Sequence, residues 1–63
     1  MKFYITEIRK QKGLSIRGLA KTANVSKSNL AEIEKGNINP KLGTMCSIAK
    51  ALDVSVHELF ECE

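Results

Sequence analysis

The 63-residue sequence predicts one all-α domain, a compact bundle of five helices that fills residues 1–63. Two observations predict this fold class. Apolar residues recur at helical spacing, and a serine-based pattern that is typical of a helix start occurs at three places. No segment shows the alternation of apolar and polar residues that predicts a strand. With 43% apolar residues, one proline and four glycines, the composition is that of a single globular domain.

The three helix starts each place an apolar residue before a serine and a leucine four positions after it. The serine side chain can accept a hydrogen bond from a free N–H of the first turn, and the two apolar residues can close as a hydrophobic staple. Glu58 completes a capping box in the third copy. The serines are Ser15, Ser26 and Ser55. The pattern predicts helices over residues 16–23, 27–35 and 56–62.

Helix ends are marked by residues that tolerate a left-handed backbone. Gly13 and Gly36 each follow a lysine and suit the position just after a helix. Asn24 suits the turn between the second and third helices, since asparagine accepts positive φ better than most residues. After a loop at residues 37–40, an apolar stripe follows at helical spacing: Leu42, Met45, Ile48, Ala49 and Leu52. The two remaining helices are predicted over residues 3–12 and 41–52.

Charge is distributed unevenly along the chain. Residues 1–50 hold all ten Lys and Arg against three Glu, whereas residues 51–63 hold four Asp or Glu and no Lys or Arg. A basic body favours a polyanion partner such as nucleic acid, although a solvated surface alone explains many basic proteins. A chain this short buries only about 60% of its unfolded surface, which leaves little room for a catalytic cleft. Because paired carboxylates, an activated nucleophile and a phosphate-binding glycine loop are missing, we expect no enzyme.

The cysteines and the histidine predict neither a metal site nor a disulfide. Cys46 and Cys62 are not spaced as a metal knuckle, and His57 has no second imidazole to complete a zinc site. Cys46 falls on an apolar helical seam and Cys62 in the tail, which favours a reduced intracellular protein. The sequence has no apolar run of about 18 residues and no signal core near its start. We expect a cytoplasmic protein without a metal, cofactor, membrane partner or evident small-molecule ligand.

Residues 16–35 form a unit of two helices joined by a tight turn. Ala20 is small enough to let the two helices cross closely at a large angle. The apolar contacts that hold this angle are expected from Leu19, Ala23, Val25, Leu30 and Ile33. The other three helices can support this pair from behind, so that its second helix projects with a polar face.

Three stretches carry a family resemblance through their order and spacing: ITEIRKQKGLS, LAKTANVSKSNLAEIEKGN and NPKLGTMCSIAKALDVSVHELF. Together they resemble the DNA-binding domain of Cro/CI-type phage repressors and bacterial Xre-like regulators. The resemblance implies a lambda-repressor-like bundle whose second and third helices form a helix-turn-helix. It also implies a small prokaryotic or phage transcriptional regulator that binds double-stranded DNA sequence-specifically, with residues 27–35 in the major groove.

The resemblance assigns base reading to the start and outward side of the third helix. Lys27, Ser28 and Glu32 match the family's principal base-reading positions. Lys27 can donate to guanine O6 or N7, Ser28 can donate or accept, and Glu32 can accept from cytosine N4. Asn29 lies at the border of the outward face, so base contact and local capping stay equally open. For Ala31, contact with a thymine methyl and a neutral role in the helix are both open.

A second group of residues matches the region that contacts DNA phosphates in this family, where contacts set register without reading sequence. The group comprises Lys35, Asn37 and Asn39, with Arg17 and Lys41 as further candidates. For each lysine, an ordinary solvated position explains the residue equally well. Ile16 stands where the family often has a glutamine that holds a phosphate, so this contact must come from Arg17, from a backbone N–H or from nothing.

Arg9 and Glu34 match positions at which the family joins its first and third helices. Each lies beside an isoleucine of its own helix, so we expect a structural ion pair that orients the third helix. Loss of one partner would be costly if the pair is desolvated.

The last predicted helix offers a surface for a second copy. Val56 and Phe60 can close a symmetric dimer or simply seal the bundle, and the sequence leaves both open. A homodimer would match a palindromic operator with half-sites about 34 Å apart. The acidic end also permits a different function, a protein-interaction module resembling an antitoxin or a recombination accessory factor.

Overall fold

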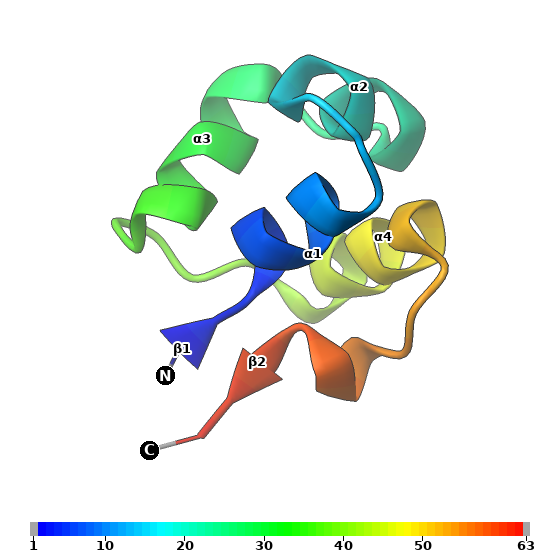
Figure 1. The fold of residues 1–63 in the computed structure, drawn as a ribbon. Coiled ribbons are helices and arrows are strands. Elements are labelled where there is room, and N and C mark those ends of the chain that lie inside the picture. The colour runs from blue at the N-terminus through cyan, green and yellow to red at the C-terminus, as the bar shows by residue number, and fades with distance from the viewer. Residues whose placement is uncertain (1, 63) are drawn as a thin grey trace.

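The computed structural model describes residues 2–62, which form four α-helices, a short 3-10 helix and a two-stranded antiparallel sheet. In chain order the elements are β1 (Lys2–Phe3), α1 (Ile5–Gln11), α2 (Ile16–Ala23), α3 (Lys27–Lys35), α4 (Leu42–Leu52), η1 (Val56–Glu58) and β2 (Phe60–Glu61). Figure 1 shows α2 and α3 on the opposite side of the molecule from the sheet, with α1 and α4 between. Among the described residues, no helix has the length and apolar character of a membrane span. Residues 1 and 63 of the predicted domain lie outside this part.

The prediction of a fifth helix over residues 56–62 is wrong. Helical structure there is limited to the single turn η1, and the chain then continues as β2, which pairs with β1. The carbonyl of Leu59 accepts the backbone N–H of Tyr4 at 2.8 Å, so it is not available to a continuing helix. This bond joins residues near the two ends of the chain, which no local pattern around Leu59 could indicate.

The same pairing shortens the first predicted helix, and the prediction that no segment forms a strand is wrong. α1 begins at Ile5 instead of residue 3, because Lys2 and Phe3 belong to β1. Phe3 lies opposite Phe60 in the sheet, and both side chains pack against the core. β1 and β2 therefore bring the two ends of the described chain together (Figure 1).

The helix boundaries predicted for α2 and α3 are confirmed. The hydroxyls of Ser15 and Ser26 each accept the backbone N–H three residues further on, at 3.0 Å in both cases. Asn24 ends α2 with φ of 58°, and Gly36 ends α3 with φ of 82°. Both residues are in the left-handed region, which explains why asparagine and glycine stand there. Caps and left-handed residues thus set the length of both helices locally.

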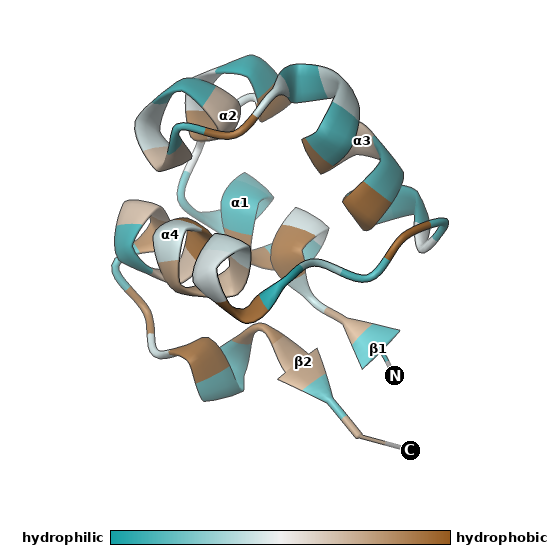
Figure 2. Cartoon of the chain, turned by 180° about the vertical axis from the view of Figure 1, so that it is seen from behind, coloured by the Kyte–Doolittle hydropathy of each residue, from teal (hydrophilic) through white to brown (hydrophobic). Residues whose placement is uncertain are grey.

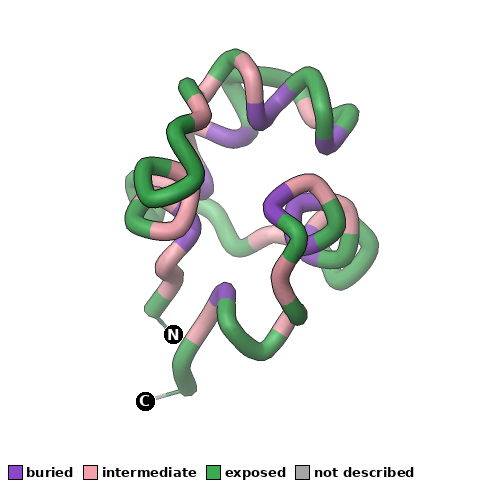
Figure 3. Tube along the Cα trace, turned by 45° about the vertical axis from the view of Figure 1, so that its right-hand side comes forward, coloured by how far each residue is buried: buried purple, intermediate pink, exposed green. Residues whose placement is uncertain are grey.

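The core is formed by buried apolar side chains from all four α-helices and from the segment after η1. Those residues are Ile5, Leu19, Ala20, Ala23, Leu30, Ile33, Met45, Ile48, Ala49, Leu52 and Leu59. Figure 3 shows these buried positions on the sides of the elements that face the centre of the molecule. Among the described residues no polar side chain is fully buried, so the core is apolar throughout.

Two residues of α4 do not lie where the apolar stripe predicts. Leu42 is 71% exposed, and Cys46, expected on an apolar seam, is exposed and free. Leu42 is the first residue of α4, and helical side chains lean toward the N-terminal end of their helix. Its side chain therefore points beyond the part of α4 that the other elements cover. Met45, two residues before Ser47, begins the buried part of the stripe.

Candidate nucleic-acid interface

α3 is held by the rest of the molecule on one side only. Leu30 and Ile33 are 0% and 1% exposed, whereas Lys27, Ser28 and Asn29 are all exposed. Figure 2 shows the same division, with hydrophilic residues over most of α3 and hydrophobic patches toward the other helices. α3 thus combines a narrow apolar anchor with a polar surface that includes its whole first turn.

The turn between α2 and α3 sets the direction in which α3 points. Asn24 ends α2 in the left-handed conformation, and the N–H of Val25 donates to the carbonyl of Ala20 at 2.9 Å. Ala20 is only 4% exposed, so its small side chain lies within the packed contact of the two helices. Two short helices joined by a three-residue turn, with the second one projecting, form the helix-turn-helix arrangement.

The first turn of α3 brings three of the predicted base-reading residues together. Lys27, Ser28 and Asn29 follow one another directly after the cap formed by Ser26. The cap uses the backbone N–H of Asn29. The Asn29 side chain makes no hydrogen bond within residues 2–62, so the alternative of local capping finds no partner there. This turn therefore exposes an ammonium, a hydroxyl and a carboxamide at successive positions, which point about 100° apart around the helix axis.

Glu32, the fourth predicted base-reading residue, is engaged within the chain. Its carboxylate accepts a hydrogen bond from Asn37 Nδ2 at 3.2 Å and lies 3.9 Å from Lys35 Nζ. The backbone N–H of Asn37 also donates to the Glu32 carbonyl, at 3.0 Å. Two predicted phosphate contacts thus engage the Glu32 carboxylate, Lys35 through its positive charge and Asn37 through a neutral hydrogen bond. These contacts are exposed, and exposed ion pairs are worth only about 0–1 kcal/mol, so DNA can replace them.

The remaining phosphate candidates lie in two places. Arg17 is exposed in the first turn of α2, while Asn39 and Lys41 are exposed in the segment that connects α3 to α4. Ile38 in the same segment is 40% exposed, an apolar exposure that sequence reasoning did not predict. Lys35 is the last residue of α3 and Asn37 lies in this segment, so four of the five candidates follow one another closely after the buried part of α3.

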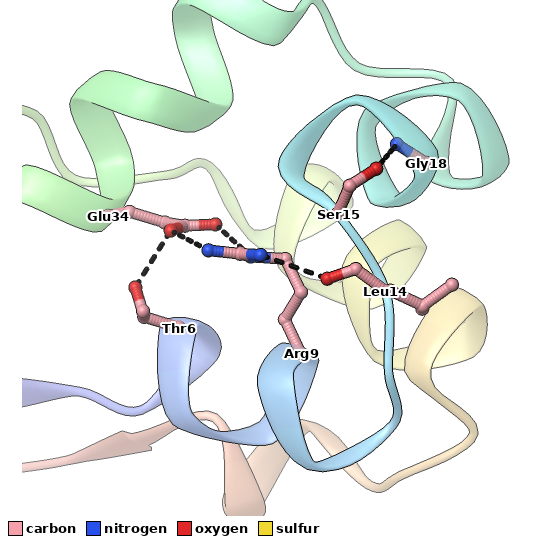
Figure 4. Close-up of polar contacts among 6 residues, drawn as sticks. All are labelled: Thr6, Arg9, Leu14, Ser15, Gly18 and Glu34. Carbon is pink, nitrogen blue, oxygen red and sulfur yellow. Dashed lines mark hydrogen bonds and ion pairs between the residues drawn. The ribbon is translucent and has the colours of Figure 1, made fainter.

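Arg9 and Glu34 lie in direct contact between α1 and α3 (Figure 4). Arg9 Nε donates to Glu34 Oε2 at 3.0 Å, and Arg9 Nη2 donates to Glu34 Oε1 at 3.1 Å. Arg9 Nη1 donates to the carbonyl of Leu14 at 2.9 Å, just before the cap of α2. The two charged side chains are only 12% and 9% exposed. The Arg9 guanidinium therefore joins the end of α3 to α1 and to the segment that precedes α2.

Sequence reasoning missed two members of this cluster. Thr6 Oγ1 donates to Glu34 Oε1 at 2.8 Å, and the Leu14 carbonyl accepts from Arg9. A signal for Thr6 existed, because a residue three positions before Arg9 shares its helix face. No signal existed for Leu14, because the acceptor is a backbone group that every residue type carries.

Val56 and Phe60 are both half-buried and pack against the core. Phe60 lies in β2 opposite Phe3, not in a helix as the sequence predicts. Each residue therefore seals part of the bundle and leaves part of its surface open.

Residues 5–59 match the family model described as Helix-turn-helix (HTH_3). The chain belongs to the helix-turn-helix family. Within this family arrangement, α2 and α3 are the two helices of the motif.

Relatives of this helix-turn-helix chain include two transcriptional regulators. The HTH-type transcriptional regulator DdrOP3 of Deinococcus deserti is 35% identical over 57 residues, which cover 90% of this chain and 44% of DdrOP3. SinR of Bacillus subtilis is 41% identical over 58 residues, which cover 90% of this chain and 52% of SinR. This chain thus spans about half the length of these curated relatives.

Solved structures share the fold over nearly the whole chain. The restriction-modification controller protein C.AhdI of Aeromonas hydrophila superimposes with a TM-score of 0.86 at 36% identity, covering 89% of this chain and 85% of that one. A crystal structure of SinR, the master regulator for biofilm formation, in complex with DNA gives a TM-score of 0.81 at 42% identity. That match covers 84% of this chain and 86% of the SinR chain.

Proposed function

We propose that this chain binds double-stranded DNA sequence-specifically, as the DNA-binding domain of a cytoplasmic prokaryotic or phage transcriptional regulator. α3 enters the major groove with its first turn toward the bases, and α2 crosses the backbone. The observation that carries the proposal is α3 itself, anchored by Leu30 and Ile33 while Lys27, Ser28 and Asn29 are exposed. The likeness to SinR, which is solved in complex with DNA, supports it and favours DNA binding over a protein-interaction module.

Base reading is divided between the first turn of α3 and Glu32 in its second turn. Lys27 donates to guanine, Ser28 donates or accepts, and Asn29 can bond an adenine edge through its carboxamide. Glu32 accepts from cytosine N4 only after Asn37 and Lys35 release its carboxylate, since both contact it in the DNA-free chain. Release is inexpensive because the contacts are exposed, and phosphates offer the same donors a new partner.

Phosphate contacts supply the affinity. The cationic contacts are Arg17, Lys35 and Lys41, and the amide side chains of Asn37 and Asn39 add neutral donors. Three neutralised phosphates per chain predict a slope of log affinity against log salt of about −2.7. The affinity should therefore fall about 40-fold between roughly 50 and 200 mM salt.

We further propose that two copies bind a palindromic operator as a homodimer, with Val56 and Phe60 in the contact. The described chain measures 29 Å along its longest axis. This length is close to the separation of about 34 Å that successive major-groove faces require of the two α3 helices.

The test is selection of duplexes from a random pool by the purified chain, followed by anisotropy titrations of the best duplex at several salt concentrations. We expect an enriched sequence with twofold symmetry, and a slope of log affinity against log salt of about −5.4, because two bound chains neutralise twice as many phosphates as one. A shuffled duplex of the same composition is the matched control. Absence of salt-sensitive binding to every duplex would refute the proposed function, and an enriched sequence without symmetry would refute the homodimer alone.

A further inference from the structure

We propose that Thr6 is a positioning residue for the recognition helix. Its hydroxyl holds the Glu34 carboxylate in the orientation that Arg9 binds, and so sets the angle at which α3 meets DNA. This inference rests on the proposed function of α3. It adds to the ion pair a residue of a different kind, a neutral donor on another helix.

The geometry places Thr6 and Arg9 on one face of α1. They are three positions apart in this helix, so their side chains lie next to each other and converge on the end of α3. Thr6 Oγ1 donates to Glu34 Oε1 at 2.8 Å, and the same oxygen accepts Arg9 Nη2 at 3.1 Å. Figure 4 shows the hydroxyl and the guanidinium reaching Glu34 Oε1 from different directions.

Because it approaches from a different direction, the Thr6 hydroxyl restrains the Glu34 carboxylate in a way that Arg9 alone does not. A carboxylate and a guanidinium joined by two parallel bonds are held in a common plane, but the pair can still rock as a unit. Arg9 is steadied by its third bond, to the Leu14 carbonyl at 2.9 Å. Within residues 2–62, Glu34 has no equivalent bond apart from the one with Thr6. The Thr6 hydroxyl therefore completes the restraint on the α3 side of the cluster.

The restraint bears on α3 because this helix is otherwise held weakly. Its fully buried contacts are Leu30 and Ile33, and apolar contacts are not directional. Glu34 directly follows Ile33, so a shift of its carboxylate changes how the end of α3 lies on α1. The Glu34 side chain is 9% exposed, and hence water competes little for the oxygen that Thr6 occupies.

The experiment compares Thr6→Val, which removes the hydroxyl at constant shape, with Thr6→Ser, which keeps it. The probes are the best duplex that the wild-type chain selects and its shuffled counterpart. Affinities are measured at a temperature at which circular dichroism shows each variant fully folded. Thr22→Val is the matched control, because the Thr22 hydroxyl donates to the Gly18 carbonyl of its own helix and to no other group of residues 2–62.

We expect Thr6→Val to weaken binding of the selected duplex by about fivefold to tenfold, the equivalent of one hydrogen bond, and to leave the shuffled duplex unchanged. Thr6→Ser and Thr22→Val should bind both duplexes as the wild type does. If Thr6→Val does not fold, Thr6→Ala takes its place with the same expectation.

Three results would overturn the inference. A folded Thr6→Val that binds the selected duplex as the wild type does would assign the hydroxyl to stability alone. An equal loss for both duplexes, or a loss in Thr6→Ser as large as in Thr6→Val, would also exclude positioning by the hydroxyl. These results concern Thr6 only, because they require a wild-type chain that binds its duplex. A wild-type chain that binds no duplex would refute the proposed function and this inference together.

Discussion

Replacing Arg9 by methionine should destabilise the fold strongly, because it breaks a nearly buried ion pair from one side. Arg9→Met keeps much of the aliphatic stem but removes two hydrogen bonds to Glu34 and one to the Leu14 carbonyl. Among the described residues, the Glu34 carboxylate, 9% exposed, then keeps only Thr6 as a partner. Breaking a buried pair in this way costs about 3–5 kcal/mol. A domain of this length is stable by about 3–9 kcal/mol in total, so the loss takes a large part of it.

The assay is thermal unfolding followed by circular dichroism. In a domain of this size each kcal/mol shifts Tm by about 4–8 °C, so Arg9→Met should melt at least about 12 °C below the wild type. Lys10→Met is the matched control, since Lys10 is exposed on the same helix, and it should change stability by less than about 0.5 kcal/mol.

A double variant separates the ion pair from the packing around it. Arg9→Met combined with Glu34→Leu removes both charges, and replacing both partners by apolar groups is far less costly than removing one. We expect the double variant to be more stable than Arg9→Met by at least about 1 kcal/mol. Additive losses in the double variant, or an Arg9→Met chain that melts with the wild type, would refute the reasoning.

Three further predictions concern the recognition helix, its anchor and the junction of the chain ends. Lys27→Ala should relax preference at one base pair, which competition titrations measure. Lys41→Ala should instead weaken all duplexes alike and reduce the salt slope by about 0.9 for each bound chain. Leu30→Ala should cost about 2–5 kcal/mol in urea unfolding, because Leu30 is 0% exposed; a loss below 1 kcal/mol would contradict its role as anchor. The hydrogen bond that Tyr4 donates to Glu61 raises the pKa of Tyr4 above its ordinary value of 10.0. Absorbance titration of this sole tyrosine should show the upward shift of its pKa, and the shift should be lost in Glu61→Gln. The contribution of this contact to the stability of the fold should be complete below pH 10 and should vanish as the pH rises through the folded-state pKa of Tyr4.

Features that depend on a few neighbouring residues were predictable. The serine caps of α2 and α3 bond to an N–H three residues away, and Asn24 and Gly36 act at their own positions. Both helices therefore begin and end where the sequence predicts. The exposed first turn of α3 follows from the same local signals, because the spacing of Leu30 and Ile33 decides which side is buried.

Features that join distant parts of the chain were not predictable by the same means. The fifth predicted helix is replaced by η1 and β2, because the Leu59 carbonyl accepts the backbone N–H of Tyr4. The capping box of Ser55 and Glu58 starts a helix but does not determine its length. Leu42 fits the apolar stripe of α4 but is exposed, since periodicity does not show where the covering elements end. The family resemblance indicated the pair of Arg9 and Glu34, and contacts of Glu32 with its neighbours appeared only in three dimensions.

The sequence by itself determined the four α-helices, the tight turn between α2 and α3, and which side of α3 faces outward, because hydrogen-bond caps, left-handed residues and helical spacing act within a few positions. Only the tertiary structure decided how firmly the orientation of α3 is held. That depends on Thr6 and Arg9 meeting Glu34 across 28 and 25 residues of chain, and on the Leu14 carbonyl that holds Arg9. The side chains that hold such a contact carry no pattern of their own, and packing of the whole bundle brings them together.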